Sequence, residues 1–541
     1  MTESPQTVRA VVGIGAITAV SRVVGLGRVL LVAAVLGTTY LGNAFQSANS
    51  VSNVVFELVA AGALSAVLVP SFVALLAAGD DADAERVAGG VLGVALLGLG
   101  AVALVGMIAA PWLARLLTVG VPDEVAAEQR SLVTFLLLFF LPQLVLYAAG
   151  TVATGVLHAK RRFLAAAAAP MANTAVTVAC LLAFRASAGP EPSLSLSGTQ
   201  RLLLALAGTG GVLAFTGVLV GALRATGFRL RPHFRSRDAR VPAVLRQAGW
   251  GVALHSSAGV ILGGALIAGA AVEGGVVAYQ VAWVFFLAPY AIFSQPIHTA
   301  ILPELVVEAG EPDLHRFATS VRWAVERVTL AMVPISLAMV VLSAPAMRLV
   351  SLGAASDGDG PTLLAVAMAS LAIGLAPYGI FLLLARAFFA LDDSRTPGRV
   401  ALGVAALGAL VMAIGSPFTE GTARIALLGA AHTVAHLVGA AVLGVLLARR
   451  THQPVLSALV VWWTGFHLVL ASLFFGAMQA LATSTPTAAR DLITCALVVA
   501  SGALVTWGAS RAMGLAQQLT RRVATGGVAG GPEVVPAGGF T

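Results

Sequence analysis

The sequence comprises 541 residues, of which 58% are hydrophobic and only 10% charged, and its mean hydropathy is +0.93. Soluble domains carry about a quarter charged residues, so these values exclude a soluble globular protein and indicate a polytopic membrane protein. The two cysteines, Cys180 and Cys495, lie in apolar stretches, which argues against a disulfide framework or a thiolate metal site.

A membrane-spanning helix needs about 20 mainly apolar residues, and fourteen stretches of the chain meet this requirement. We predict an all-α polytopic membrane protein with about 14 transmembrane helices, in two pseudo-symmetric six-helix lobes plus two extra C-terminal helices. The predicted spans are 8–37, 43–77, 87–118, 131–158, 163–184, 201–223, 241–270, 274–305, 322–350, 362–390, 398–416, 423–448, 456–482 and 491–513.

The two halves of the sequence carry prolines at corresponding positions. Pro70 and Pro303 close spans 2 and 8, and Pro142 and Pro377 lie in spans 4 and 10, with offsets of 233 and 235 residues. An even number of spans per half gives both halves the same orientation. We therefore expect an N-terminal lobe over 1–230, a C-terminal lobe over 231–450, an extra helix pair over 451–515, and a disordered cytoplasmic tail over 516–541.

Arginine placement orients the chain. Loops after even-numbered spans carry Lys160 to Arg162, six arginines between residues 224 and 240, and Arg449 with Arg450, whereas loops after odd-numbered spans are neutral or acidic. The acidic loop after span 2 is an exception, but carboxylates contribute little to this rule. We predict a multi-pass protein of the plasma (inner) membrane with both termini cytoplasmic. The net charge of +8 is thus a topology signal and not a nucleic-acid footprint.

Two arginines, Arg22 and Arg28, lie inside the first apolar span. A guanidinium keeps its proton, so each must face water, an anion or a protein cavity. We predict that both project into a central cavity and hold an anionic cargo. The alternatives are snorkelling to the membrane surface and a fixed salt bridge with Glu57 in span 2.

Span 2 combines Glu57 with a polar face that includes Asn49 and Asn53. Glu57 is a candidate coupling site for a proton or ion, or the partner of an arginine. The polar face either lines the cavity or forms hydrogen bonds between helices. In the second half, His255 in span 7 and His298 in span 8 mirror these positions, and either cavity or packing roles fit them.

His432 and His436 in span 12 have the i, i+4 spacing of a metal site, but no carboxylate or cysteine accompanies them. We therefore expect neither a metal site nor a cofactor. The sequence also lacks nucleotide-binding and hydrolase motifs, so an enzyme is not expected.

Several segments in order resemble the MurJ/MviN-type lipid II flippases of the multidrug/oligosaccharidyl-lipid/polysaccharide exporter superfamily. The resemblance covers about residues 8–450. The segments are Ser21 to Arg28, Asn43 to Phe45, Asn53, Gly62 to Ser65, Val69-Pro70, Arg162-Phe163, Pro170, Asn173, Tyr279 to Ala282, Pro289-Tyr290, Thr299 to Pro303 and Ala385 to Pro397.

The resemblance implies a bundle that flips the undecaprenyl-pyrophosphate-linked peptidoglycan precursor by alternating access, with spans 13 and 14 forming a groove for its lipid tail. The implied partners are this lipid-linked anionic substrate, membrane lipids and cell-wall synthesis proteins. This chain departs from the family at Val29 and Asn43, where many members carry an acid, and around Gln280, where they carry an arginine. A less cationic cavity is therefore expected.

Two alternative functions remain open from the sequence. The first is export of another undecaprenyl-linked saccharide, or drug antiport, within the same superfamily. The second is a non-transporting role as a cell-wall paralogue.

Overall fold

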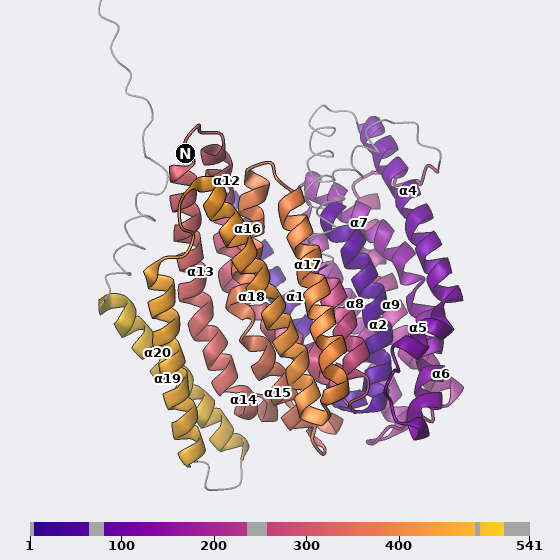
Figure 1. The fold of residues 1–541 in the computed structure, drawn as a ribbon. Coiled ribbons are helices and arrows are strands. Elements are labelled where there is room, and N and C mark those ends of the chain that lie inside the picture. The colour runs from indigo at the N-terminus through magenta and orange to yellow at the C-terminus, as the bar shows by residue number, and fades with distance from the viewer. Residues whose placement is uncertain (1–4, 64–80, 235–256, 482–486, 513–541) are drawn as a thin grey trace, which may run out of the picture.

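The structure is a computed structural model that describes residues 5–63, 81–234, 257–481 and 487–512. Within these ranges the chain is helical, and two groups of helices lie side by side with a separate pair at one flank (Figure 1). The first group, lobe 1, consists of α1 (Pro5–Leu36), α2 (Tyr40–Ala63), α4 (Asp81–Ile108), α5 (Ala110–Leu116), α6 (Asp123–Phe140), α7 (Gln143–Ala159), α8 (Phe163–Ala188) and α9 (Gly198–Arg224).

The second group, lobe 2, begins with a helix over residues 257–269. It continues with α11 (Gly275–Pro289), the π-helical turn η2 (Tyr290–Ser294), α12 (Gln295–Ala309), α13 (His315–Val341), α14 (Ser343–Val350), η3 (Gly353–Ser356), α15 (Gly360–Ala372), α16 (Leu375–Ala390), α17 (Arg395–Gly415), η4 (Ser416–Phe418) and α18 (Gly421–Thr451). The flanking pair is α19 (Ala458–Leu481) and α20 (Ala488–Ala512).

Helices are expected here because lipid offers no hydrogen bonds to an unsatisfied backbone. Among the described residues, ten helices are long and apolar enough to cross a membrane, and the bent pair α15–α16 makes an eleventh. The other three predicted spans fall on α1, α2 and residues 257–269, of which the structure describes a part. The prediction of an all-α, two-lobed membrane protein is confirmed; the predicted tail, 516–541, lies outside the described residues.

Spans 4 and 10, which carry one pair of the repeated prolines, are both interrupted helices. Span 4 divides into α6 and α7 at Pro142, and span 10 divides into α15 and α16 just before Pro377, with a bend of 41°. Proline has no N–H to donate to the carbonyl four residues earlier and clashes with it. The Pro142 and Pro377 positions thus both lie at helix breaks, whereas Pro303 lies within α12 and Pro70 lies outside the described residues.

The cores of the two lobes are apolar and closely packed. In lobe 1, Phe140 and Phe184 are fully buried, and Phe45 meets Phe140 edge-on with ring centroids 5.8 Å apart. In lobe 2, Phe286, Phe317 and Phe381 are fully buried. Large apolar side chains of α19 and α20, in contrast, are exposed, as expected of helices that face lipid tails.

A bidentate ion pair fastens the α19–α20 pair to lobe 2. Arg348 of α14 donates from Nε to Asp491 Oδ2 (2.8 Å) and from Nη2 to Asp491 Oδ1 (2.6 Å). The Asp491 side chain is 7% exposed and that of Arg348 is 37% exposed. Two parallel charge-assisted hydrogen bonds fix orientation as well as distance, so this pair anchors the start of α20.

Replacing Asp491 by alanine should loosen α20. Leaving a partly buried guanidinium without its carboxylate costs on the order of 1–3 kcal/mol. Amide hydrogen exchange along α20 should therefore accelerate in Asp491→Ala. Glu311→Ala, which removes the exposed ion pair with Arg316, is the control and should leave α20 unchanged. Equal exchange in the two variants would contradict the anchoring role.

Candidate functional site

The structure describes four of the seven predicted site residues with their side chains. Arg28 on α1 and Asn49 and Asn53 on α2 are partly buried, and His298 on α12 is fully buried. Arg22 and Glu57 have their backbones in α1 and α2, but their side chains lie outside the described part, as does all of His255.

Three helices of lobe 1 bring polar groups to one place inside the bundle. Tyr147 of α7 donates its hydroxyl hydrogen to Asn53 Oδ1 of α2 at 2.9 Å. The same tyrosine lies in the neighbourhood of the guanidinium of Arg28 on α1. We call Arg28, Asn53 and Tyr147 the lobe-1 site. It offers guanidinium and amide donors at membrane depth, the combination that binds phosphate oxygens.

Sequence reasoning missed Tyr147. It lies five residues after Pro142 in a helix that also carries Gln143, Thr151 and Thr154, and these scattered polar residues do not single out the tyrosine. The sequence signal that could have pointed to Tyr147 is Pro142, because a proline marks span 4 as irregular near the place where Tyr147 contacts α2.

A polar side chain of α2 in lobe 1 also forms a hydrogen bond with lobe 2. Gln280 Nε2 of α11 donates to Ser50 Oγ of α2. Together with the Tyr147–Asn53 bond, this gives the polar face of span 2 the inter-helix hydrogen bonds that were one of its two expected roles. Asn49 lies one turn before Asn53 and is partly exposed.

Asn43 joins the two lobes at the start of α2. Its Nδ2 donates to Val272 O at 2.8 Å, and its Oδ1 accepts from the N–H groups of Val276 (3.0 Å) and Val277 (3.4 Å). The asparagine is fully buried. Val276 and Val277 belong to the first turn of α11, whose N–H groups have no partner within the helix. One side chain of lobe 1 thus caps a helix of lobe 2.

Glycines let the backbones approach around Asn43. A Cβ at Gly42 would lie 2.7 Å from Val277 Cγ2, one at Gly274 would lie 2.5 Å from Thr38 Cβ, and one at Gly353 would lie 2.5 Å from Ala34 O. Gly274 (φ +71°) and Gly353 (φ +57°) also adopt a left-handed backbone, which L side chains rarely adopt. We call this junction of residues 34–43 with 272–277 and 353–360 the seam.

Asn43→Ala should open the seam. The change leaves the buried Val272 carbonyl and the Val276 and Val277 N–H groups without their side-chain partner, at a cost on the order of 2 kcal/mol. Thr38, which is 8% exposed, reports the change. A Thr38→Cys thiol should react with a water-soluble maleimide slowly in the parent protein and several-fold faster with Asn43→Ala.

Two controls accompany this experiment. Ser356→Cys is exposed on the same side and should react rapidly in both backgrounds. Asn49→Ala, on the same helix, should leave the Thr38→Cys rate unchanged. An unchanged Thr38→Cys rate with Asn43→Ala would show that the amide does not hold the seam.

His298 lies in the interior of lobe 2, packed against the π-helical turn η2. Its Nε2 lies 3.1 Å from Ser294 Oγ, and its ring stands edge-on to Tyr290 with centroids 5.8 Å apart. Gly379 of α16 packs here, because a Cβ would lie 2.9 Å from Ser294 Oγ. In this conformation His298 is part of the packed interior of lobe 2. It could contact a cargo only if the helices around it moved apart.

Arg386 of α16 lies in the neighbourhood of Tyr290 and His298. The sequence placed it only within the segment Ala385 to Pro397. Lobe 2 therefore has an arginine–tyrosine combination of its own, although its span 8 is uncharged around Gln280.

The end of that same segment forms a helix corner. Asp393 accepts from Thr396 N at 3.0 Å, from Thr396 Oγ1 at 2.7 Å and from Arg450 Nη1 at 3.2 Å. Partial burial favours the neutral carboxyl, but these hydrogen bonds and the Arg450 guanidinium together hold the pKa of Asp393 below its ordinary value. Asp393 therefore fixes the α16–α17 turn to the end of α18.

His432 and His436 of α18 lie in an aromatic core and are fully buried. Their ring centroids are 4.2 Å apart, and the Tyr378 ring lies 5.9 Å from that of His432 and stands edge-on to that of His436 at 5.1 Å. Among the described residues, no group of three or more histidine, cysteine or carboxylate side chains is placed to hold a metal ion.

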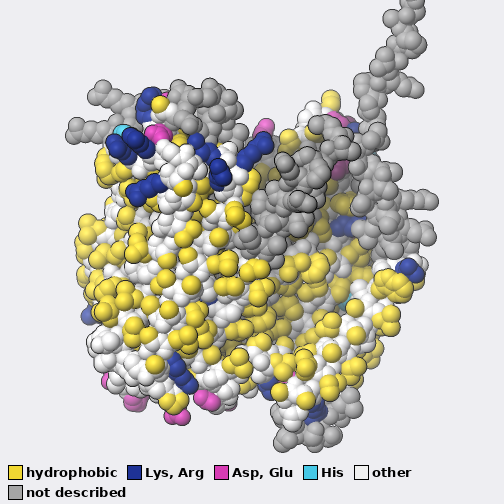
Figure 2. Space-filling view, turned by 180° about the vertical axis from the view of Figure 1, so that it is seen from behind, with side chains coloured by type: hydrophobic (Ala, Val, Ile, Leu, Met, Phe, Trp, Pro, Cys, Tyr) yellow, Lys and Arg dark blue, Asp and Glu magenta, His cyan; other side chains and the backbone are white. Residues whose placement is uncertain are grey.

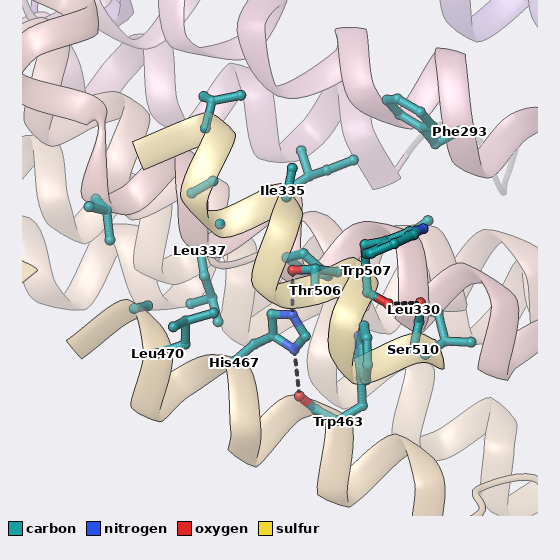
Figure 3. Close-up of a pocket in the computed structure, with 18 of the residues that line it drawn as sticks. Phe293, Leu330, Ile335, Leu337, Trp463, His467, Leu470, Thr506, Trp507 and Ser510 are labelled. Carbon is teal, nitrogen blue, oxygen red and sulfur yellow. Dashed lines mark hydrogen bonds between the residues drawn. The ribbon is translucent and has the colours of Figure 1, made fainter. Parts of the chain in front are cut away.

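An apolar groove of about 700 Å³ runs between α13, α19 and α20 (Figure 3). Leu330, Ile335, Leu337 and Leu470 line it. The side chain of His467 on α19 links this helix to α20, because its Nε2 lies within hydrogen-bonding distance, 3.1 Å, of Thr506 Oγ1. Arg327, only 7% exposed, lies with its guanidinium 5.2 Å from the centroid of the Trp323 ring. The groove suits a hydrocarbon chain.

Comparison with known proteins gives one consistent family. Residues 32–499 match the family described as lipid II flippase MurJ. A Rhizobium tropici protein named probable lipid II flippase MurJ is 27% identical over 452 residues, which are 82% of this chain and 81% of that protein. A Burkholderia cenocepacia protein named lipid II flippase MurJ is 26% identical over 403 residues, 73% of this chain and 76% of that protein.

Solved structures share the fold. A lipid II flippase MurJ in an inward closed conformation has a TM-score of 0.72 at 17% identity, covering 93% of this chain and 99% of that one. A multidrug resistance transporter of the MATE family in an inward-facing conformation has a TM-score of 0.62 at 15% identity, covering 80% of this chain and 94% of that one.

Proposed function

The chain belongs to the lipid II flippase MurJ family, and from that premise we propose that it carries lipid II from the inner to the outer leaflet of the plasma membrane by alternating access. The product of this movement is the precursor from which the cell wall is built.

The lobe-1 site is the observation that carries this proposal. A pyrophosphate headgroup must leave water to cross the bilayer, and fixed cations and donors offset the cost of its desolvation. Arg28 supplies a permanent cation there, and Tyr147 lies near Arg28 and donates a hydrogen bond to Asn53.

We assign the remaining predicted residues to the same site. Arg22 precedes Arg28 by six residues, which turns its direction by about 120° on an ideal helix, and Gly25 and Gly27 between them permit bending. Glu57 holds an arginine when the cavity is empty and yields it to the incoming anion. Asn49, His255 and His298 contact the sugar and peptide parts of the cargo as the lobes rearrange.

The seam and the groove have different roles in this proposal: the seam closes one end of the molecule, and the groove holds the lipid tail. The seam closes the end that carries Glu273 and Asp357, so cargo enters from the arginine-rich end. We place that end, and both termini, in the cytoplasm. The groove between α13, α19 and α20 accommodates the polyprenyl chain while the headgroup moves between the lobes.

Arg28→Ala should abolish or strongly reduce flipping. A hydrogen bond to a charged group contributes about 1.5–3 kcal/mol, so delivery of lipid II to the outer leaflet should fall about tenfold or more. Arg28→Lys should rescue only in part, because an ammonium lacks the planar fork of a guanidinium. The measurement is growth rescue together with outer-leaflet lipid II after depletion of the parent gene.

Arg399→Ala, at an exposed position of α17, is the matched control and should rescue fully at equal membrane abundance. Normal outer-leaflet lipid II with Arg28→Ala would remove Arg28 from the site. Normal outer-leaflet lipid II after depletion of the whole protein would instead favour another cargo or a non-transporting role.

The orientation is tested by thiol labelling. Ala225→Cys, just after α9, and Ser356→Cys, near α15, are both exposed and lie at opposite ends of the spans. An impermeant maleimide should label Ser356→Cys in intact cells and Ala225→Cys only after permeabilisation. The reverse pattern would invert the topology, and labelling of both from one side would contradict it.

A further inference from the structure

The segment that follows α9 is seated in a groove on α4. His233 N donates to Gly89 O at 2.8 Å, and Arg229 N donates to Glu85 Oε1 at 2.6 Å. A Cβ at Gly89 would lie 2.2 Å from Arg231 O, and one at Gly93 would lie 2.3 Å from His233 O. Two glycines one helical turn apart therefore leave room for residues 229–233, and the segment has a fixed course.

Five arginines gather at this end of lobe 1. Arg161 and Arg162 follow α7, Arg224 ends α9, and Arg229 and Arg231 lie on the seated segment; all five are exposed. Lys160 Nζ lies 5.3 Å from the centroid of the Phe228 ring and so links the end of α7 to this segment. We call these five arginines the basic platform. Figure 2 shows Lys and Arg side chains gathered along this edge of the molecule.

The charges of the platform are not neutralised within the part of the chain that the structure describes. None of the five guanidinium groups forms an ion pair there. Five like charges held close together repel one another, and an external anion relieves that repulsion. The carboxylate of Glu85, which accepts from the backbone N–H of Arg229, places a single negative charge beside these five positive ones.

Apolar side chains place the platform at the membrane surface. Leu164 (57% exposed) follows the arginines of α7, and Phe234 (55% exposed) follows the seated segment. Arginines next to exposed aromatic and aliphatic groups at helix ends lie at the depth of lipid headgroups. Clusters of four to eight basic residues in this position attract anionic lipids.

We propose that the basic platform is a preorganised binding site for anionic phospholipid headgroups of the leaflet that it faces. Its arginines come from the ends of α7 and α9 and from the segment seated on α4, so a bound headgroup bridges three helices of lobe 1. The site is separate from the lobe-1 site, and the proposal holds whether or not the cargo is lipid II.

The test titrates short-chain phosphatidylglycerol, and phosphatidylcholine as the neutral lipid, into the purified full-length protein and follows its unfolding temperature. Phosphatidylglycerol alone should stabilise the parent protein. The triple variant Arg161→Gln, Arg229→Gln, Arg231→Gln should need about tenfold more phosphatidylglycerol or more for the same shift, given the attraction of each arginine for an anionic surface.

A charge-matched variant makes the test specific. Arg395→Gln, Arg399→Gln and Arg449→Gln remove three exposed arginines from the same end of lobe 2 and should leave the response intact. Arg28→Ala should do likewise, which separates this site from the cargo site. Equal losses in the two triple variants, or none in the platform variant, would overturn the proposal.

The contact of residues 229–233 with α4 is tested by a second pair of variants. Gly89→Ala keeps every charge but displaces residues 229–233, and should weaken the phosphatidylglycerol response. Gly98→Ala on the same helix, where a Cβ meets nothing within 4 Å, should not. A normal response with Gly89→Ala would overturn the preorganisation of the site.

Discussion

The junction at Asn43 determines which end of the molecule is closed. A buried amide is stable only when its donor and acceptor both find partners, and Asn43 finds them on the backbone of lobe 2 at Val272, Val276 and Val277. The glycines of the seam follow from this bond, because side chains there would hold the backbones apart. An ionised carboxylate could accept from the two N–H groups but could not donate to the Val272 carbonyl. The asparagine therefore forms this junction without a titratable group.

A second feature of the structure is that each lobe has an arginine in the neighbourhood of a buried or half-buried tyrosine. Arg28 lies near Tyr147 in lobe 1, and Arg386 lies near Tyr290 in lobe 2. The missing arginine of span 8 therefore does not leave lobe 2 without a cation, since α16 supplies one beside the π-helical turn. Both lobes of the proposed carrier thus contain a permanent cation.

Local and non-local features of this chain differ in how far the sequence reveals them. The spans and their breaks follow from apolar length and from Pro142 and Pro377, which act on their own helices. Arg28 is visible because a guanidinium in an apolar span always needs an explanation. The partners of Asn43, 229 residues away for Val272, and the proximity of Arg386 to Tyr290 depend on packing between helices. No periodicity of one helix encodes such a contact, so Tyr147 and the surroundings of Arg386 emerged only from the structure.

The α19–α20 pair shows why a groove persists beside a closely packed lobe. Inside a membrane, apolar helix faces gain little by meeting one another, because lipid tails are as apolar as leucine. Polar bonds therefore set the position of the pair: Arg348 with Asp491 at the start of α20, and His467 with Thr506 between the two helices. Between these fixed points the apolar walls of the groove are free to stand apart, since a hydrocarbon chain fills the space without loss. Directional hydrogen bonds thus give the molecule a buried junction at Asn43, and their scarcity between α13 and the α19–α20 pair leaves lobe 2 with an open apolar flank.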